Sequence, residues 1–119
     1  GVQACALPIY VQVVAFNGPL FFVGTDNLRN QINELSTKPF LVLDFSNVPT
    51  MDETGAFALR DLARQLQGEG TTVYVGGLRK KPLRMLTRIG LTGDLGTSRI
   101  CTELESALRE ASREAAQTA

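Results

Sequence analysis

Apolar residues recur along this chain with two different spacings. Short apolar runs rich in β-branched and aromatic side chains are typical of buried strands, and three of them lie at residues 9–16, 40–45 and 71–75. Elsewhere, apolar residues recur every three or four positions, which predicts amphipathic helices. The helix after the second run would bury one face made of Leu59, Leu62, Ala63 and Leu66.

Capping residues mark where the other helices begin and end. Thr25 is a suitable N-cap for a first helix, and Pro82 fits the first residue of a third helix that Gly90 would end. Residues 98–101 predict a short last strand, and a final helix follows Thr102. The apolar face of the first helix would consist of Leu28, Ile32 and Leu35.

Strands and helices therefore alternate along most of the chain. Parallel strands need such crossover connections, so the pattern predicts an α/β fold with a mostly parallel sheet. The turn-forming pair Asn17-Gly18 and a second apolar run at 19–23 predict a hairpin, which would add an antiparallel edge. We expect one domain over residues 1–119, with a four- to five-stranded sheet and about four helices.

Composition excludes several classes of function. The 12 basic and 12 acidic residues cancel, whereas a general nucleic-acid binder needs a basic excess. There is no histidine, which removes the commonest metal ligand and general base, and Cys5 and Cys101 have no metal-ligand or disulfide spacing. We predict no catalytic residue, metal or cofactor, and we expect no secretory leader. The chain begins with Gly1 rather than Met, and either a cloning remnant or excision from a longer protein would explain this.

The turn between the 40–45 strand and the next helix is the first candidate site. It carries two carboxylates and a hydroxyl on Asp52, Glu53 and Thr54, followed by Gly55. Sites in open α/β sheets gather at this edge, beyond the carboxyl ends of the strands. The alternative is purely local: Thr50 and Glu53 fit a capping box, and Asp52 could itself cap the helix.

Residues 48–56, Val-Pro-Thr-Met-Asp-Glu-Thr-Gly-Ala, resemble the signature turn of STAS domains. This family includes anti-sigma-factor antagonists and the C-terminal domains of SulP sulfate and anion transporters. Antagonists carry Asp-Ser-Ser-Gly or Asp-Ser-Thr-Gly here, and a partner kinase phosphorylates the first serine. Asp52 and Gly55 match, but the phosphoacceptor position holds Glu53, which already carries a negative charge. Thr54 is left as the candidate phosphosite.

Two further segments resemble the SulP branch of the family. Residues 17–22, Asn-Gly-Pro-Leu-Phe-Phe, are similar to a stretch common in SulP STAS domains, and residues 88–91 to the exit of the family's third helix. The resemblance covers residues 9–111. It implies a non-enzymatic regulatory domain of a sulfate or anion transporter, on the cytoplasmic side of the membrane. Its expected partners are the transporter's transmembrane domain and a second STAS domain in a homodimer.

The alternative within the family is a stand-alone anti-sigma-factor antagonist that acts by partner switching. It would use the same turn to bind a kinase-like anti-sigma factor, and phosphate charge would break the contact. Glu53 argues against this alternative.

A second candidate site is a run of cations without any acid among them. It consists of Arg79, Lys80, Lys81, Arg84 and Arg88. One interpretation is a solvated helix face. The other is a docking patch for an acidic protein, an anionic membrane surface or the permeant anion. The nearby Gly-Gly-Leu-Arg-Lys sequence at 76–80 lacks the spacing of a phosphate-binding loop.

Overall fold

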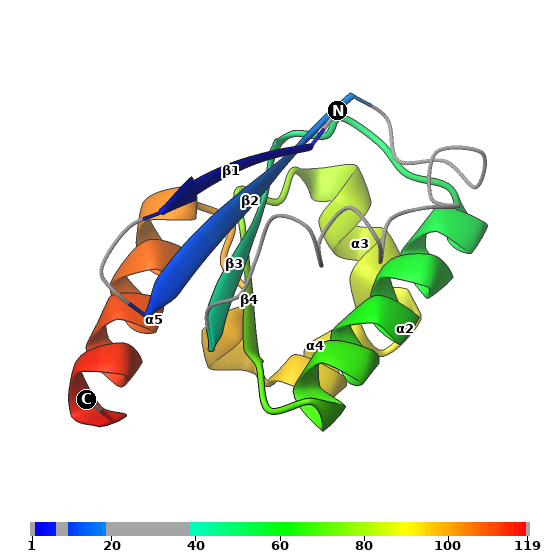
Figure 1. The fold of residues 1–119 in the computed structure, drawn as a ribbon. Helices are drawn as coiled ribbons and strands as arrows, with labels where there is room; N and C mark the ends of the chain where they lie inside the picture. Colours follow the sequence, from blue (N-terminus) through cyan, green and yellow to red (C-terminus); the bar gives the residue numbers. More distant parts are fainter. Residues whose placement is uncertain (1, 7–9, 19–38, 119) are drawn as a thin grey trace.

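The computed structural model describes residues 2–6, 10–18 and 39–118, and these residues form a four-stranded sheet with helices on both faces (Figure 1). The strands lie in the order β1-β2-β3-β4. The pair β1 and β2 is antiparallel, whereas β2 with β3 and β3 with β4 are parallel. Their bounds are β1 (Val2–Ala6), β2 (Val11–Asn17), β3 (Phe40–Asn47) and β4 (Thr72–Gly76).

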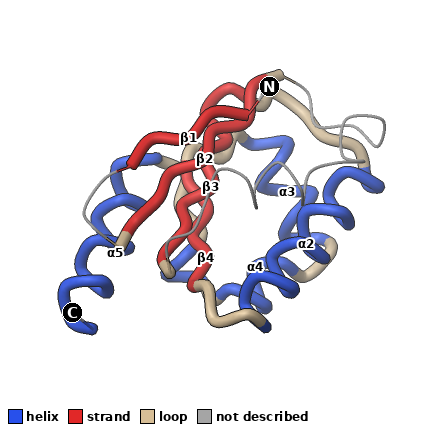
Figure 2. Tube along the Cα trace, in the orientation of Figure 1, coloured by secondary structure: helices blue, strands red, loops and turns tan. Residues whose placement is uncertain are grey.

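The described helices divide into two layers around the sheet (Figure 2). One layer is α5 alone, and the other consists of α2, α3 and α4. No described helix is both long and apolar enough to cross a membrane. The bounds are α2 (Glu53–Gly68), α3 (Lys80–Arg88), α4 (Leu91–Leu95), the 3-10 helix η2 (Thr97–Arg99) and α5 (Leu104–Thr118).

The alternation of side chains along β3 builds the two halves of the core. Leu41, Leu43 and Phe45 pack toward α2, α3 and α4, whereas Phe40 and Val42 face α5. Both faces of the strand are buried, which explains its continuous apolar sequence. α5 contributes mainly small side chains to its contact with the sheet, from Ala107, Ala111 and Ala115. Its backbone therefore lies close to the sheet.

Most of the predicted elements are confirmed. The three apolar runs form β2, β3 and β4, and the predicted face of α2 is buried. Gly90 ends α3 with a φ of 89°, in the left-handed region that favours glycine. The α3 helix begins at Lys80 rather than Pro82, which is still within the first turn, where backbone N–H groups have no partner inside the helix.

The antiparallel edge is present, but its observed partner strand differs from the predicted one. β1 pairs with β2 from the N-terminal side, with Val2 opposite Phe16 and Ala6 opposite Gln12. The predicted hairpin strand at 19–23 and the predicted first helix after Thr25 lie outside the described residues.

The predicted strand at 98–101 is wrong. The chain turns through η2, after Gly96 with a φ of 91°, and only Ile100 forms a parallel bridge, to Val75. The backbone N–H of Cys101 then donates to the carbonyl of Val75 at 2.8 Å. The tight turn consumes the residues that a longer strand would need.

Candidate functional site

Asp52 forms the N-cap of α2. Its Oδ1 accepts a hydrogen bond from the backbone N–H of Gly55 at 2.6 Å, and its own backbone is extended, with a φ of −86° and a ψ of 171°. This geometry satisfies one of the backbone donors that a helix start leaves unpaired. The capping interpretation of Asp52 is therefore correct, whereas the Thr50–Glu53 capping box is wrong because the helix begins at Glu53.

The two residues after the cap point into solvent. Glu53 and Thr54 are exposed in the first turn of α2, whereas Gly55 is buried against the body of the protein. The carboxylate of Asp52 is half-buried and held by its capping bond. The turn therefore exposes one carboxylate and one hydroxyl to solvent at the start of a capped helix.

The end of β3 positions the start of α3. Asp44 Oδ1 accepts hydrogen bonds from the backbone N–H of Ser46 at 2.9 Å and from its hydroxyl at 2.6 Å. Gly77 lies between β4 and α3 and packs against this turn, with a φ of 73°. A Cβ at Gly77 would lie 2.8 Å from the Ser46 nitrogen. The Nε of Arg79 donates to the Ser46 carbonyl at 3.2 Å, which ties the N-cap of α3 to the end of β3.

The other four cations of the predicted run lie exposed on α3. Within the described part of the chain, none of them has an acidic side chain within 4 Å. Two of them occupy the first turn of the helix, where the positive end of the helix dipole makes cations unfavourable. The four are Lys80, Lys81, Arg84 and Arg88.

The structure places the cations of α3 beside the two residues that precede the first candidate site. A surface depression of about 260 Å³ is shared by the segment just before Asp52 and by α3. The sequence predicts the cations of this depression but not the presence of Thr50 and Met51, because nothing in their local pattern marks these two residues as neighbours of α3. The described residues that line this depression are Thr50, Met51, Lys81, Arg84, Met85 and Arg88.

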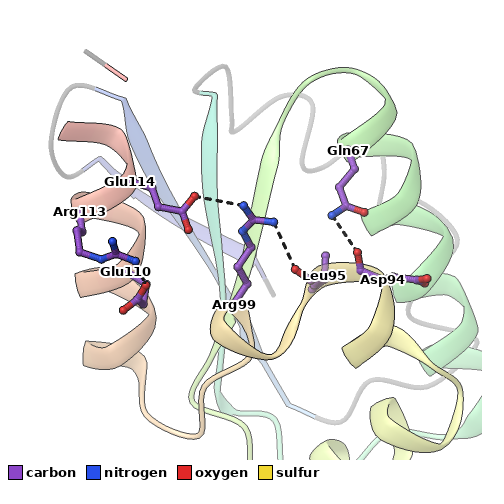
Figure 3. Close-up of polar contacts among 7 residues, drawn as sticks. All are labelled: Gln67, Asp94, Leu95, Arg99, Glu110, Arg113 and Glu114. Carbon is purple, nitrogen blue, oxygen red and sulfur yellow. Dashed lines mark hydrogen bonds and ion pairs between the residues drawn. The ribbon is translucent and has the colours of Figure 1, made fainter. Parts of the chain in front are cut away.

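Arg99, although close in sequence to this run, belongs to a different cluster (Figure 3). Its guanidinium forms an ion pair with Glu114 of α5 at 3.2 Å and donates to the Leu95 carbonyl at 3.4 Å. It also lies 5.8 Å from the ring centroid of Tyr74. Arg99 therefore fastens α5 to the η2 turn and contributes no charge to the α3 face.

This cluster shifts the protonation equilibria of its members. Burial, followed by the carboxylate of Glu114, raises the pKa of the Tyr74 hydroxyl. Burial acts to raise the pKa of Glu114, but the nearby Tyr74 hydroxyl and Arg99 guanidinium outweigh it and lower that pKa. Among the described residues, no three Asp, Glu, Cys or His side chains lie close enough together to hold a metal ion.

Comparison with known proteins identifies the family. The model of the STAS domain matches residues 9–111. The chain belongs to the STAS domain family. The STAS resemblance drawn from the sequence and the predicted STAS fold are thereby confirmed. A search of the curated proteins found no match.

Solved structures of two transporter proteins and of an anti-sigma factor antagonist are similar to this chain. A sulfate transporter family protein from Wolinella succinogenes is 27% identical, with a TM-score of 0.79 over 91% of this chain and 89% of that chain. The STAS domain of a SulP transporter from Vibrio cholerae is 26% identical, with a TM-score of 0.81 over 94% and 88%. An anti-sigma factor antagonist from Mycobacterium paratuberculosis is 22% identical, with a TM-score of 0.78 over 93% and 92%, and this likeness shows the fold alone.

Proposed function

We propose that this STAS domain is the regulatory, protein-interaction domain of a SulP-type sulfate or anion transporter. The observation that carries the proposal is the likeness to a sulfate transporter family protein and to the STAS domain of a SulP transporter, at 27% and 26% identity over about nine tenths of each chain. On this proposal, residues 1–119 form one domain of a longer membrane protein. The domain lies on the cytoplasmic side of the membrane and contacts the transmembrane domain or a second STAS domain.

The chemistry of the candidate site supports a binding role rather than catalysis. Asp52 is committed to capping α2, and the groups that face solvent beside it are the carboxylate of Glu53 and the hydroxyl of Thr54. The chain has no histidine to act as general base for that hydroxyl. A fixed helix start flanked by an exposed cationic helix is suited to recognising a charged surface.

A stand-alone anti-sigma-factor antagonist is the second candidate function. The fold shared with the Mycobacterium paratuberculosis antagonist favours it, as do Asp52 and Gly55 at the signature turn. Glu53 weighs against it, because a glutamate already carries charge where a switch needs a neutral hydroxyl. Incubation with candidate anti-sigma kinases and ATP, followed by mass spectrometry, tests it: phosphate on Thr54 would favour the antagonist.

The transporter proposal is tested on the full-length gene product. We expect roughly ten or more apolar spans of about 20 residues each before this segment. Purified full-length protein in proteoliposomes should take up radiolabelled sulfate or a related anion, and the double variant Glu53→Lys/Thr54→Lys should change the uptake rate. The matched control is Arg109→Glu, an exposed change on α5 across the sheet. A gene product without membrane spans would refute the proposal.

A further inference from the structure

The exposed face of α3 carries a concentration of charge that nothing in the described fold balances. Lys80, Lys81, Arg84 and Arg88 lie within nine residues, and no described acidic side chain is within 4 Å of them. By contrast, Arg64, Arg99 and Arg113 each pair with an acid. Among the described residues, the other cations without an acid within 4 Å are Arg79, which precedes α3, and Arg109 on α5. The unpaired cations are therefore concentrated on α3, and two of them occupy its unfavourable first turn.

The same face of α3 also borders two surface depressions. Arg84 and Arg88 line two depressions at once. The first, of about 260 Å³, lies toward Thr50 and Met51. The second, of about 530 Å³, lies toward Lys80, Leu83 and Thr87. Each depression places half-buried or buried apolar side chains beside the cations, namely Met51 and Met85 in one and Leu83 in the other.

From this combination we infer that the α3 face binds an acidic, amphipathic polypeptide segment. Aspartate and glutamate side chains would pair with Arg84, Arg88 and the flanking lysines, and apolar side chains between the acids would enter the two depressions. Alternating acids and apolar anchors at helical spacing would match a cationic ridge with apolar hollows on both sides.

A lipid surface fits this relief less well. Binding to a membrane interface favours apolar side chains that project outward between cations. Here the apolar residues are recessed: Met51 is 4% exposed, and Leu83 and Met85 are only partly exposed, whereas the cations stand in solvent. A polypeptide has side chains long enough to reach into such hollows. The inference deepens the proposed interaction role of this face and does not depend on whether the chain is part of a transporter.

Fluorescence anisotropy with two labelled peptides tests the inference on the 119-residue chain. The first peptide carries glutamate and leucine at helical spacing, and the second has every leucine replaced by serine, so that charge is unchanged. We expect the Glu/Leu peptide to bind, and the Glu/Ser peptide to bind at least about fivefold more weakly. Raising the salt concentration from about 50 to about 300 mM should weaken the binding several-fold.

Variants then locate the contact. Arg84→Glu/Arg88→Glu should weaken the Glu/Leu peptide by about tenfold or more, because it replaces attraction with repulsion. Arg109→Glu on α5 changes one exposed arginine in the same way and should leave the affinity within about twofold. Circular dichroism checks that both variants remain folded, and the salt series on the unmodified chain gives a readout that needs no variant.

Three outcomes would overturn the inference. They are equal affinity for the two peptides, affinity unaffected by the α3 double variant, and absence of peptide binding together with α3-dependent sedimentation on phosphatidylserine vesicles. The last outcome would assign the face to anionic lipid. None of these outcomes bears on whether the full-length gene encodes a transporter, so the two proposals fail separately.

Discussion

Gly77 packs against Ser46 so closely that its position has no room for a side chain. A Cβ at Gly77 would lie 2.8 Å from the Ser46 nitrogen and 2.9 Å from Asp44 Oδ1, and the φ of 73° is itself unfavourable for other residues. This contact packs the segment between β4 and α3 against the end of β3. The orientation of α3 therefore depends on a close backbone contact that does not involve its cations.

Gly77→Ala should lower the free energy of unfolding by about 3 kcal/mol, from a strained φ together with displacement of the Ser46 turn. Urea denaturation followed by circular dichroism measures the change. Gly93→Ala is the matched control, because a Cβ there meets nothing within 4 Å. A Gly77→Ala variant as stable as the control would mean that the contact is not as tight as described.

Asp52→Ala should lower the free energy of unfolding by about 1 kcal/mol, since it removes the cap of α2. Asp52→Asn should retain most of the stability, because an amide oxygen can accept the same bond from Gly55. Urea titration compares the two with Asp61→Ala, whose side chain is 69% exposed and which should change stability by less than about 0.5 kcal/mol. Equal losses for the alanine and asparagine variants would contradict the capping role.

Glu114 makes stability sensitive to acid. Its pKa is lowered in the folded state, so the unfolded chain binds a proton first as the pH falls. The stabilisation is therefore present above the unfolded pKa of about 4.5 and is lost as the pH drops through the lower folded value. Thermal unfolding between about pH 6 and about pH 3 should show a smaller acid-induced loss for Glu114→Gln than for the unmodified chain.

The exposed residue Glu105 gives the control for this experiment. Glu105→Gln should reproduce the pH dependence of the unmodified chain. If Glu114→Gln did so as well, the Arg99–Glu114 pair would contribute nothing to acid sensitivity.

Gly76 and Ala107 should be energetically coupled. A Cβ on Gly76 would lie 2.8 Å from the Cβ of Ala107, so Gly76→Ala would push α5 away from β4. Adding Ala107→Gly removes the conflicting methyl group, and the double variant should be about 1 kcal/mol more stable than the sum of the single effects predicts. A double-mutant cycle by urea denaturation measures this coupling, and strict additivity would show that α5 does not press on β4 at this point.

The sequence predicts those parts of the fold where buried residues form either a continuous apolar run or a helical repeat. β2, β3 and β4 are visible because their side chains are apolar on both faces, and α2 because its buried residues recur at helical spacing. The sequence does not predict β1, because residues 2–6, Val-Gln-Ala-Cys-Ala, form neither an apolar run nor a helical repeat. These residues form a strand by pairing with β2. The last strand was wrongly predicted because its apolar residues follow a tight turn instead.

For the candidate site, the sequence supplies the charges but not their neighbours. The five cations were found as a run, yet only the packing separates Arg79, tethered to Ser46, from the four that face solvent. Similarly, Thr50 and Met51 lie more than 30 positions before Arg84, and only the packing of the α2 start beside α3 joins them in one depression. Distances between helices depend on the whole core, which no local pattern encodes.

The sheet stands between α5 and the α3 face, and its two sides are filled by separate apolar clusters. Substitutions on the exposed sides of α3 and α5 alter different groups of neighbours, so their effects should add. In practice, a fluorophore or surface tether attached to the exposed side of α5, at Arg109 for instance, would report on ligands of α3 without touching them. The exposed side of α5 is therefore a suitable attachment site away from the candidate binding surface on α3.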